Sequence, residues 1–166
     1  MRLAPVTDGD IAALVRHFSE PQIQRYLDDD LPVTYDRVNA IATTSDRDFS
    51  ASKFGIWAMH SVEHAAAIGI CGLRSMAGSV AVELLFSVRP RYAKQGYAFE
   101  AAAAVLDYGF EQLGFEQVFA VCEANNPAAA SILKRLGMQP VVPVRPGKTM
   151  IDFVIRRETR SRGVTA

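Results

Sequence analysis

The fold is decided by residues 86–101, which read Phe86-Ser87-Val88-Arg89-Pro90-Arg91-Tyr92-Ala93-Lys94-Gln95-Gly96-Tyr97-Ala98-Phe99-Glu100-Ala101. The stretch joins the end of a strand, a short basic loop with one glycine, and the alanine-rich start of a helix. Such a loop points backbone N–H groups outward from the N-terminus of a helix, where the helix dipole favours negative charge. The sequence therefore predicts a phosphate site beside a strand that presents groups to whatever the phosphate carries.

The composition is that of a globular protein. Of the 166 residues, 49% are hydrophobic and 22% are charged, and the formal net charge is zero. We expect one domain over residues 1–155, followed by a polar, frayed C-terminal tail over residues 156–166. Zero net charge argues against bulk binding to nucleic acid or to a membrane surface, and no apolar run approaches the length of a bilayer span. Cys71 and Cys122 lie in apolar runs without CxxC spacing, which predicts buried, reduced thiols and a cytoplasmic protein.

Hydrophobic periodicity and turn residues predict the order of helices and strands. We expect helices capped by Thr7 and by Thr34, one from Ala98 to Gly114 and one from Pro127 to Gly137. After a short N-terminal strand, we expect strands over Lys53–His60, Ala65–Arg74, Val80–Val88, Glu116–Ala124, Met138–Val144 and Met150–Ile155. Short connections favour antiparallel pairing, and the one helical crossover favours one parallel pair. The predicted fold class is α+β, or mixed α/β.

Two motifs carry a resemblance to a known family. The first is the strand Val82-Glu83-Leu84-Leu85-Phe86 followed by the loop and helix start at residues 92–101, and the second runs from Asn126-Pro127 to Gly137-Met138. With these motifs the chain resembles the GNAT superfamily of acyl-CoA N-acyltransferases from Arg2 to about Ile155, and looks closest to its RimJ/RimL-type ribosomal-protein N-acetyltransferases. The resemblance implies a GNAT-like fold: a central, mostly antiparallel mixed sheet with one parallel pair around the cofactor cleft and helices on both faces.

The resemblance implies acetyl-CoA as co-substrate and a set of residues that bind it. The strand end would lie along the pantetheine arm, the loop would hold the pyrophosphate, and the asparagine would contact the arm from the far side. These implied residues are Phe86, Ser87, Val88, Ala93, Lys94, Gln95, Gly96, Tyr97, Ala98 and Asn126. Ala93 departs from the family pattern, which has Arg or Gln in many members and often Trp in this branch. The departure removes a side chain and leaves the backbone cradle in place.

Acetyl transfer from a thioester to an amine requires a base for the amine and a donor for the developing oxyanion. The candidate donor is the backbone N–H of Val88, where the strand turns into the loop. The candidate base is Glu83, which interrupts an apolar strand and matches a glutamate that this branch often carries, acting directly or through water. The alternative is a structural or substrate-binding glutamate, because paired carboxylates also occur in structural networks.

The general acid is not identified by the sequence. Ala129 stands where this branch usually has serine, and Leu133 stands where many GNAT enzymes have a tyrosine that protonates the leaving thiolate. Ser131, Tyr108 and Cys122 are possible acids by residue type alone. These departures keep an alternative open, namely a degenerate domain that binds acyl-CoA as a sensor without turnover. A domain that binds a phosphate ligand other than CoA is a third possibility.

The sequence leaves the acceptor open. The acidic run Asp28-Asp29-Asp30 would attract a cationic amine, or would be an ordinary solvated loop. Trp57 is interpreted as a core residue that can still line the acceptor pocket. No metal site is predicted, and His17, His60 and His64 are interpreted as surface residues. The expected partner is a primary amine, either a protein N-terminus or a small molecule, and the protein is expected to be a monomer or a homodimer.

Overall fold

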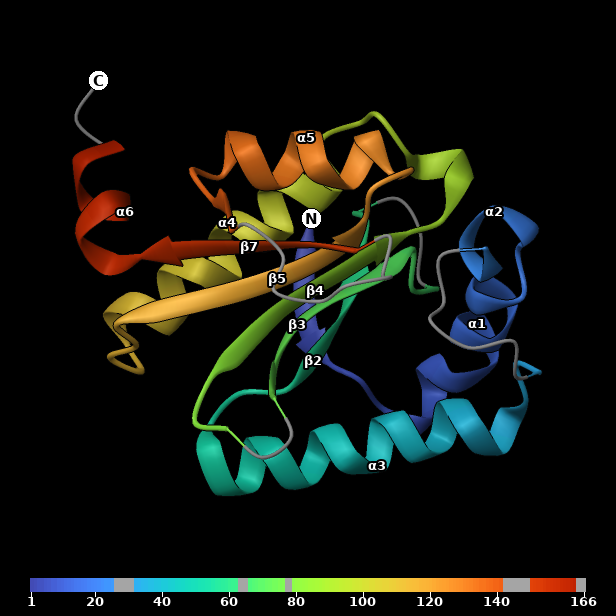
Figure 1. Ribbon diagram of the computed structural model, residues 1–166. Helices are drawn as coiled ribbons and strands as arrows, with labels where there is room; N and C mark the ends of the chain where they lie inside the picture. The colour runs from blue at the N-terminus through green and yellow to red at the C-terminus, as the bar shows by residue number, and fades with distance from the viewer. Residues whose placement is uncertain (26–31, 63–65, 77–78, 142–149, 164–166) are drawn as a thin grey trace.

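The computed structural model of the chain describes residues 1–25, 32–62, 66–76, 79–141 and 150–163. Its centre is one seven-stranded sheet with the strand order β1-β2-β3-β4-β5-β7-β6 (Figure 1). The strands are β1 (Arg2–Pro5), β2 (Ile56–His60), β3 (Gly69–Ser75), β4 (Val82–Val88), β5 (Gln117–Glu123), β6 (Gln139–Val141) and β7 (Met150–Arg156). The helices are α1 (Asp8–Phe18), α2 (Pro21–Gln24), α3 (Tyr35–Ser52), the 3-10 turn η1 (Pro90–Tyr92), α4 (Tyr97–Glu111), α5 (Pro127–Arg135) and α6 (Arg157–Gly163).

The strand directions confirm the predicted mixed sheet. Strands β1 to β4 pair in chain order and antiparallel, as their short connections predict. Strand β5 pairs with β4 in parallel, because α4 carries the chain across the sheet between them. Strand β7 then pairs antiparallel with both β5 and β6, so that the last strand in the sequence is not the last in the sheet.

The two N-terminal helix caps are also confirmed. Thr7 precedes α1, and the Asp10 carboxylate accepts from both the backbone N–H and the hydroxyl of Thr7 at 3.0 and 2.9 Å. Thr34 precedes α3, and its hydroxyl accepts from the backbone N–H of Arg37 at 3.2 Å. Each cap satisfies N–H groups that the first turn of a helix leaves without a partner, which is why each helix begins at that residue.

Helices cover both faces of the sheet, and each face has its own hydrophobic core (Figure 1). On one face α4 and α5 pack their apolar sides, including Leu106 and Leu133, against the strands. On the other face α1 and α3 contribute the smaller cluster around Ile11 and Val38. Both cysteines are free and buried in the sheet, as predicted. Of the helices in the described segments, none combines the length and apolar character needed to cross a membrane.

Several predicted boundaries are wrong. The strand expected from Ala65 begins at Gly69, the strand expected from Val80 begins at Val82, and the helix expected over 98–114 spans Tyr97–Glu111. The strand expected from Lys53 begins three residues later at Ile56, because Lys53 ends α3 in the left-handed conformation with φ of 65°. The tail expected to be frayed forms α6 over residues 157–163. Its anchor is Arg160, whose guanidinium donates to the carboxylate of Asp107 at 2.8 Å and to two backbone carbonyls. The polar composition of this segment did not predict a packed helix, because an arginine and not an apolar residue attaches it to the rest of the protein.

Candidate functional site

Strands β4 and β5 separate after a single point of pairing. Their parallel register contains one pair, Glu83 with Phe119, over the described residues of both strands. By contrast, β4 pairs with β3 at seven positions and β5 with β7 at seven. The last residues of β4 therefore have a ladder on the β3 side and an open edge on the β5 side. An extended group can add to such an edge as another strand would.

The direction of the backbone at the end of β4 follows from one hydrogen bond. The N–H of Arg89 donates to the carbonyl of Ile68 at 2.9 Å, so the backbone groups of Arg89 and, two residues earlier, Ser87 face β3. Backbone groups alternate in direction along a strand. The N–H groups of Phe86 and Val88 consequently face the separation between β4 and β5. This is the orientation that a donor to an oxyanion in that separation needs.

The loop before α4 turns through left-handed backbone twice. Lys94 has φ of 62° and Gly96 has φ of 90°, and Gly96 is the N-cap of α4. Residues 93–96 are exposed, and a Cβ added at Gly96 would meet no atom within 4 Å. The backbone N–H groups of Tyr97 and Ala98 belong to the first turn, where no partner exists inside the helix. Loop and helix start together present backbone N–H groups in an arrangement that suits an anion such as a pyrophosphate.

Glu83 is buried on the face of the sheet that α1 and α3 cover. Its side chain is 10% exposed, and one carboxylate oxygen lies 2.8 Å from Nε of Arg74 on β3. Alternation puts Glu83 on the same face as Leu85, which packs against the α1–α3 core. Val88 is five residues further along β4, about 16 Å away at the rise of a strand. The predicted base and the predicted oxyanion donor are thus not neighbours.

Ser87 contacts a histidine that the sequence interpretation placed on the surface. His17 of α1 is fully buried, and its Nε2 lies 2.9 Å from Oγ of Ser87. His60 is buried as well and lies 3.5 Å from Asp10. The prediction of surface histidines is wrong for both, and His64 lies outside the described residues. The signal was present, because Asp10 and His17 have the seven-residue spacing of the buried face of α1.

The surroundings of His17 keep its imidazole neutral. Burial lowers its pKa from 6.5 to about 4, while Glu20 raises the pKa and Arg89 lowers it by smaller amounts. A neutral imidazole has one donor and one acceptor nitrogen. Nε2 faces the Ser87 hydroxyl, and Nδ1 has no hydrogen-bond partner in the described part of the chain. Half of the hydrogen-bonding capacity of this ring is therefore unused among the described residues.

The start of α5 lies at the same end of the sheet as the open edge of β4. Parallel strands end at the same edge, so Asn126, just after β5, lies on the side where β4 ends. The side-chain oxygen of Asn126 accepts from the backbone N–H of Ala129 at 3.1 Å and caps α5. Leu133 is 1% exposed and belongs to the core, with Ala129 packed against the same cluster. The two positions where the family resemblance implies serine and tyrosine are occupied here by packing residues.

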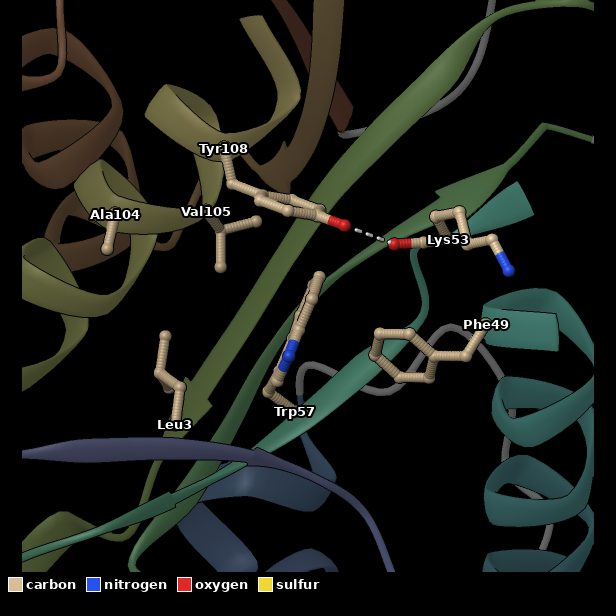
Figure 2. Close-up of a pocket in the computed structure, with 7 residues that line it drawn as sticks. All are labelled: Leu3, Phe49, Lys53, Trp57, Ala104, Val105 and Tyr108. Atoms are coloured by element: carbon tan, nitrogen blue, oxygen red, sulfur yellow. Dashed lines mark hydrogen bonds between the residues drawn. The ribbon is translucent and has the colours of Figure 1, made fainter. Parts of the chain in front are cut away.

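A hollow of about 440 Å³ lies elsewhere, between the end of α3 and the middle of α4 (Figure 2). Its lining is mostly apolar and consists of Leu3, Phe49, Lys53, Trp57, Ala104, Val105 and Tyr108. Trp57 stands between Phe49 and Tyr108 with nearly perpendicular rings, and the Tyr108 hydroxyl donates to the Lys53 carbonyl at 2.7 Å. Tyr108 is eleven residues past Tyr97, about 16 Å along α4. The hollow is therefore distinct from the anion-binding loop.

The predicted site residues divide into those brought together and those left apart. Residues 86–88, the loop at 93–98 and Asn126 all meet at one end of the β4–β5 separation. Glu83 lies at the other end, where the strands still pair. The acidic run at 28–30 lies outside the described residues. Within the described ranges, no three His, Cys, Asp or Glu side chains gather as a metal site would require.

The same order of strands, loop and helix is that of a known domain. The model of the acetyltransferase (GNAT) domain matches residues 1–139. The chain belongs to the GNAT acetyltransferase family. The match includes β4, the anion-binding loop, α4, β5 and α5, so the family assignment rests on the elements that form the candidate site.

Curated relatives of this GNAT domain are distant in sequence. The uncharacterised N-acetyltransferase YoaA of Bacillus subtilis is 24% identical over 138 residues, which are 82% of this chain and 78% of that protein. The uncharacterised N-acetyltransferase YnaD of the same organism is 34% identical over 62 residues, which are 37% of this chain and 36% of that protein. The second match therefore spans only about a third of each protein.

Solved structures share the fold of this GNAT domain. An acetyltransferase from Agrobacterium tumefaciens superposes with a TM-score of 0.78 at 20% identity, covering 93% of this chain and 89% of that one. A ribosomal-protein-alanine N-acetyltransferase from Brucella melitensis superposes with a TM-score of 0.77 at 14% identity, covering 94% and 99%. At such identities the likeness concerns the fold.

Proposed function

We propose that this GNAT domain transfers an acetyl group from acetyl-CoA to a primary amine, by direct attack in a ternary complex. The observation that carries the proposal is the separation of β4 from β5, which opens directly onto the anion-binding loop at the start of α4. A strand edge and an anion site in continuous line are what a pantetheine arm joined to a pyrophosphate needs.

In this proposal the donor is held mainly by backbone. The pantetheine arm lies along the open edge at Phe86, Ser87 and Val88, and the pyrophosphate accepts from amides of residues 94–98. Asn126 contacts the arm from the β5 side with the part of its amide that does not cap α5. The family side chain missing at Ala93 is not needed, because the left-handed turns at Lys94 and Gly96 already point amides outward.

The chemistry requires a neutral amine and a stabilised oxyanion. The amine nitrogen attacks the thioester carbonyl, a proton leaves the nitrogen, and the carbon–sulfur bond breaks to release the thiolate. Free lysine titrates near ~10 and an α-amino group near ~8, so a base speeds the reaction at neutral pH. Val88 N–H is the proposed oxyanion donor. Because Glu83 is about 16 Å from Val88 along the strand, its proposed role as base requires a chain of several water molecules, since hydrogen-bonded oxygens are only about 2.8 Å apart.

No strong acid is needed for the leaving group in this mechanism. A thiol titrates near ~8.5, so its thiolate departs readily near neutral pH. This reasoning accommodates Ala129 and Leu133. Two other residues are candidates for the general acid by residue type. Tyr108 donates a hydrogen bond from its hydroxyl to the Lys53 carbonyl at the separate hollow, and burial raises the pKa of the Cys122 thiol.

The acceptor is proposed to be a protein N-terminus or a small-molecule amine, in an enzyme of the RimJ/RimL-like branch. The fold shared with a ribosomal-protein-alanine N-acetyltransferase supports the first possibility. A cytoplasmic location is proposed from the two buried, free thiols, which suit a reducing compartment. We expect the protein to act as a monomer or a homodimer, without nucleic acid or membrane as partner.

Two measurements test the function together. Calorimetry with acetyl-CoA measures binding of the donor, and release of free CoA thiol measures turnover with a panel of amines that includes a polyamine, lysine, and peptides starting with alanine or serine. Micromolar binding with amine-dependent thiol release is the expected result. Binding without release on any amine would instead favour the acyl-CoA sensor, and absence of CoA binding would leave only a different phosphate ligand.

The role of Glu83 is tested by Glu83→Gln. We expect turnover to fall by roughly 100-fold, within the range that general bases contribute, with acetyl-CoA affinity changed by less than about threefold. Glu116→Gln is the matched control, because Glu116 is an exposed glutamate that also faces an arginine. Equal loss of affinity and turnover in the Glu83 variant would assign this residue to structure.

A further inference from the structure

Both chain neighbours of Val88 are attached to the corner between α1 and α2. The Ser87 hydroxyl lies 2.9 Å from Nε2 of His17, and Nε of Arg89 donates to the carboxylate of Glu20 at 2.9 Å. His17 is in the last turn of α1, and Glu20 is the N-cap of α2. Residues 70 and 69 positions apart in the sequence are thus joined at two nearby points of the proposed donor site.

Both attachments hold the segment around Val88 from the same face of the sheet. Ser87 and Arg89 are two residues apart, so both side chains extend to the face that α1 covers, while the N–H of Val88 between them faces the β4–β5 separation. Their backbone groups also bond to β3 through the Arg89–Ile68 hydrogen bond. With both neighbours held, the peptide plane that carries the Val88 N–H has little freedom to rotate.

Stability alone does not account for a histidine at this place. His17 is fully buried with Nδ1 unpartnered in the described part of the chain, and an unpartnered buried polar atom costs free energy. An apolar side chain on α1 would pack against the same core without that cost. Arg89 and Glu20 are likewise mostly buried, with side chains 16% and 28% exposed, so their pair is shielded from screening by salt.

We propose that His17–Ser87 and Glu20–Arg89 form a clasp that positions the Val88 N–H as oxyanion donor. This inference rests on the proposed function and adds four positioning residues to it. None of the four touches the reacting atoms. They act by fixing the donor before the thioester arrives, and preorganised donors are the largest source of rate enhancement in acyl transfer. Loosening the clasp therefore lowers turnover and leaves donor binding largely intact.

The test compares His17→Leu, Ser87→Ala and the double variant with wild type. We expect kcat on the best amine of the panel to fall about tenfold in each single variant, with acetyl-CoA affinity changed by less than about threefold. The double variant should be no slower than the slower single variant, because each single change already removes the same His17–Ser87 contact. Unchanged kcat in stable variants, or fully additive losses, would overturn the clasp.

Ser45→Ala is the matched control. Ser45 is also a buried serine that joins a helix to the sheet, since its hydroxyl accepts from the N–H of Ile56 at 2.7 Å, but it lies on α3, away from the end of β4. The control should lower thermal stability without lowering kcat. If His17→Leu fails to fold, Ser87→Ala still decides the question, because truncation at a half-buried serine leaves the core unchanged.

A readout independent of turnover separates this inference from the proposed function. In the CoA-bound protein, the backbone amide resonance of Val88 should shift in Ser87→Ala and exchange faster with solvent, and should stay unchanged in Ser45→Ala. A Val88 amide that is the same in wild type and Ser87→Ala would refute the clasp even if the enzyme is active. If wild-type protein binds CoA and releases no thiol with any amine, the transferase function is refuted. The Val88 resonance would still show whether the clasp holds the Val88 amide in place.

Discussion

At the scale of single residues, Gly96 is the residue on which the proposed anion site depends most directly. Its φ of 90° lies in the left-handed region that favours glycine, and a Cβ there would meet open space and no protein atom within 4 Å. The open space is the concavity in which the pyrophosphate is proposed to lie. A side chain at this position would occupy the proposed site of the ligand, and its cost to the protein itself would be the strain of a left-handed backbone.

Gly96→Glu should lower acetyl-CoA affinity at least about 100-fold, equivalent to about 2.7 kcal/mol, because it adds both bulk and a like charge to a phosphate site. Calorimetry measures the change. Gly114→Glu is the matched control, since Gly114 has φ of 76° just beyond the other end of α4 and would suffer the same backbone strain and charge. Equal affinity in the Gly96 variant and wild type would rule out this loop as the pyrophosphate site.

His17 links stability to pH in a defined direction. Its pKa is 6.5 when exposed and about 4 in the folded protein, so between these values the unfolded chain binds the proton and the folded chain does not. The stability associated with the neutral ring is complete above pH 6.5 and is lost as the pH falls toward 4, about 3 kcal/mol in all. Denaturant unfolding at pH 7.5 and pH 5 should show a loss in wild type that is about 2 kcal/mol larger than in His17→Leu. The same loss in both proteins would contradict burial of a neutral His17.

At the scale of elements, β3 lies close against the backbone of β4 where β4 ends. A Cβ added at Gly69 would lie 2.3 Å from the carbonyl oxygen of Ser87 and 2.9 Å from Cα of Val88. Both are backbone atoms, which cannot rotate away as a side chain can. The absence of a side chain at this position therefore allows the end of β4 to lie where the proposed donor site needs it.

Gly69→Ala should lower the free energy of unfolding by about 2–3 kcal/mol, as overpacking of a core does, and should weaken acetyl-CoA binding by moving β4. Denaturant unfolding and calorimetry measure the two effects. Gly9→Ala is the control, for which we expect a change in the free energy of unfolding of the opposite sign. Gly9 lies exposed in α1, and its added Cβ would be 3.6 Å from the nearest atom. Alanine there should raise the free energy of unfolding by about 0.5–1 kcal/mol. A Gly69 variant as stable as wild type would show that β3 can move aside at no cost.

Helices and strands were predictable where local rules suffice. The caps at Thr7 and Thr34 and the helix start at Pro127 are set by neighbouring residues and lie where the sequence predicts. Helix α4 begins at Tyr97, one residue before the predicted Ala98. The start of β2 was misplaced because left-handed backbone at a lysine, as in Lys53, has no sequence signature of the kind that glycine gives.

At the scale of the whole molecule, α6 attaches the C-terminal end of the chain to α4. The Arg160 guanidinium binds the Asp107 carboxylate and the carbonyls of Ala103 and Leu136, which belong to α4 and to the end of α5. Arg160→Ala should lower the free energy of unfolding by about 1–2 kcal/mol, since bonds to a partly buried charge exceed those of an exposed pair. Arg156→Ala, at an exposed arginine, should change it by less than about 0.5 kcal/mol. Thermal unfolding compares the two, and equal effects would mean that α6 adds no stability.

The sequence by itself determined the mixed sheet, the single parallel pair and the loop that ends in Gly96. Each depends on local chemistry: turn residues, alternation, caps, and the length of one crossover. Only the tertiary structure decided that β4 and β5 pair at one point, that Glu83 faces Arg74, and that His17 reaches Ser87. These contacts join residues far apart in the chain, and their geometry follows from how two faces of a sheet are packed. Local pattern carries no information on that packing, so the glycine loop before α4 could be predicted from the sequence and the contacts proposed as a clasp around Val88 could not.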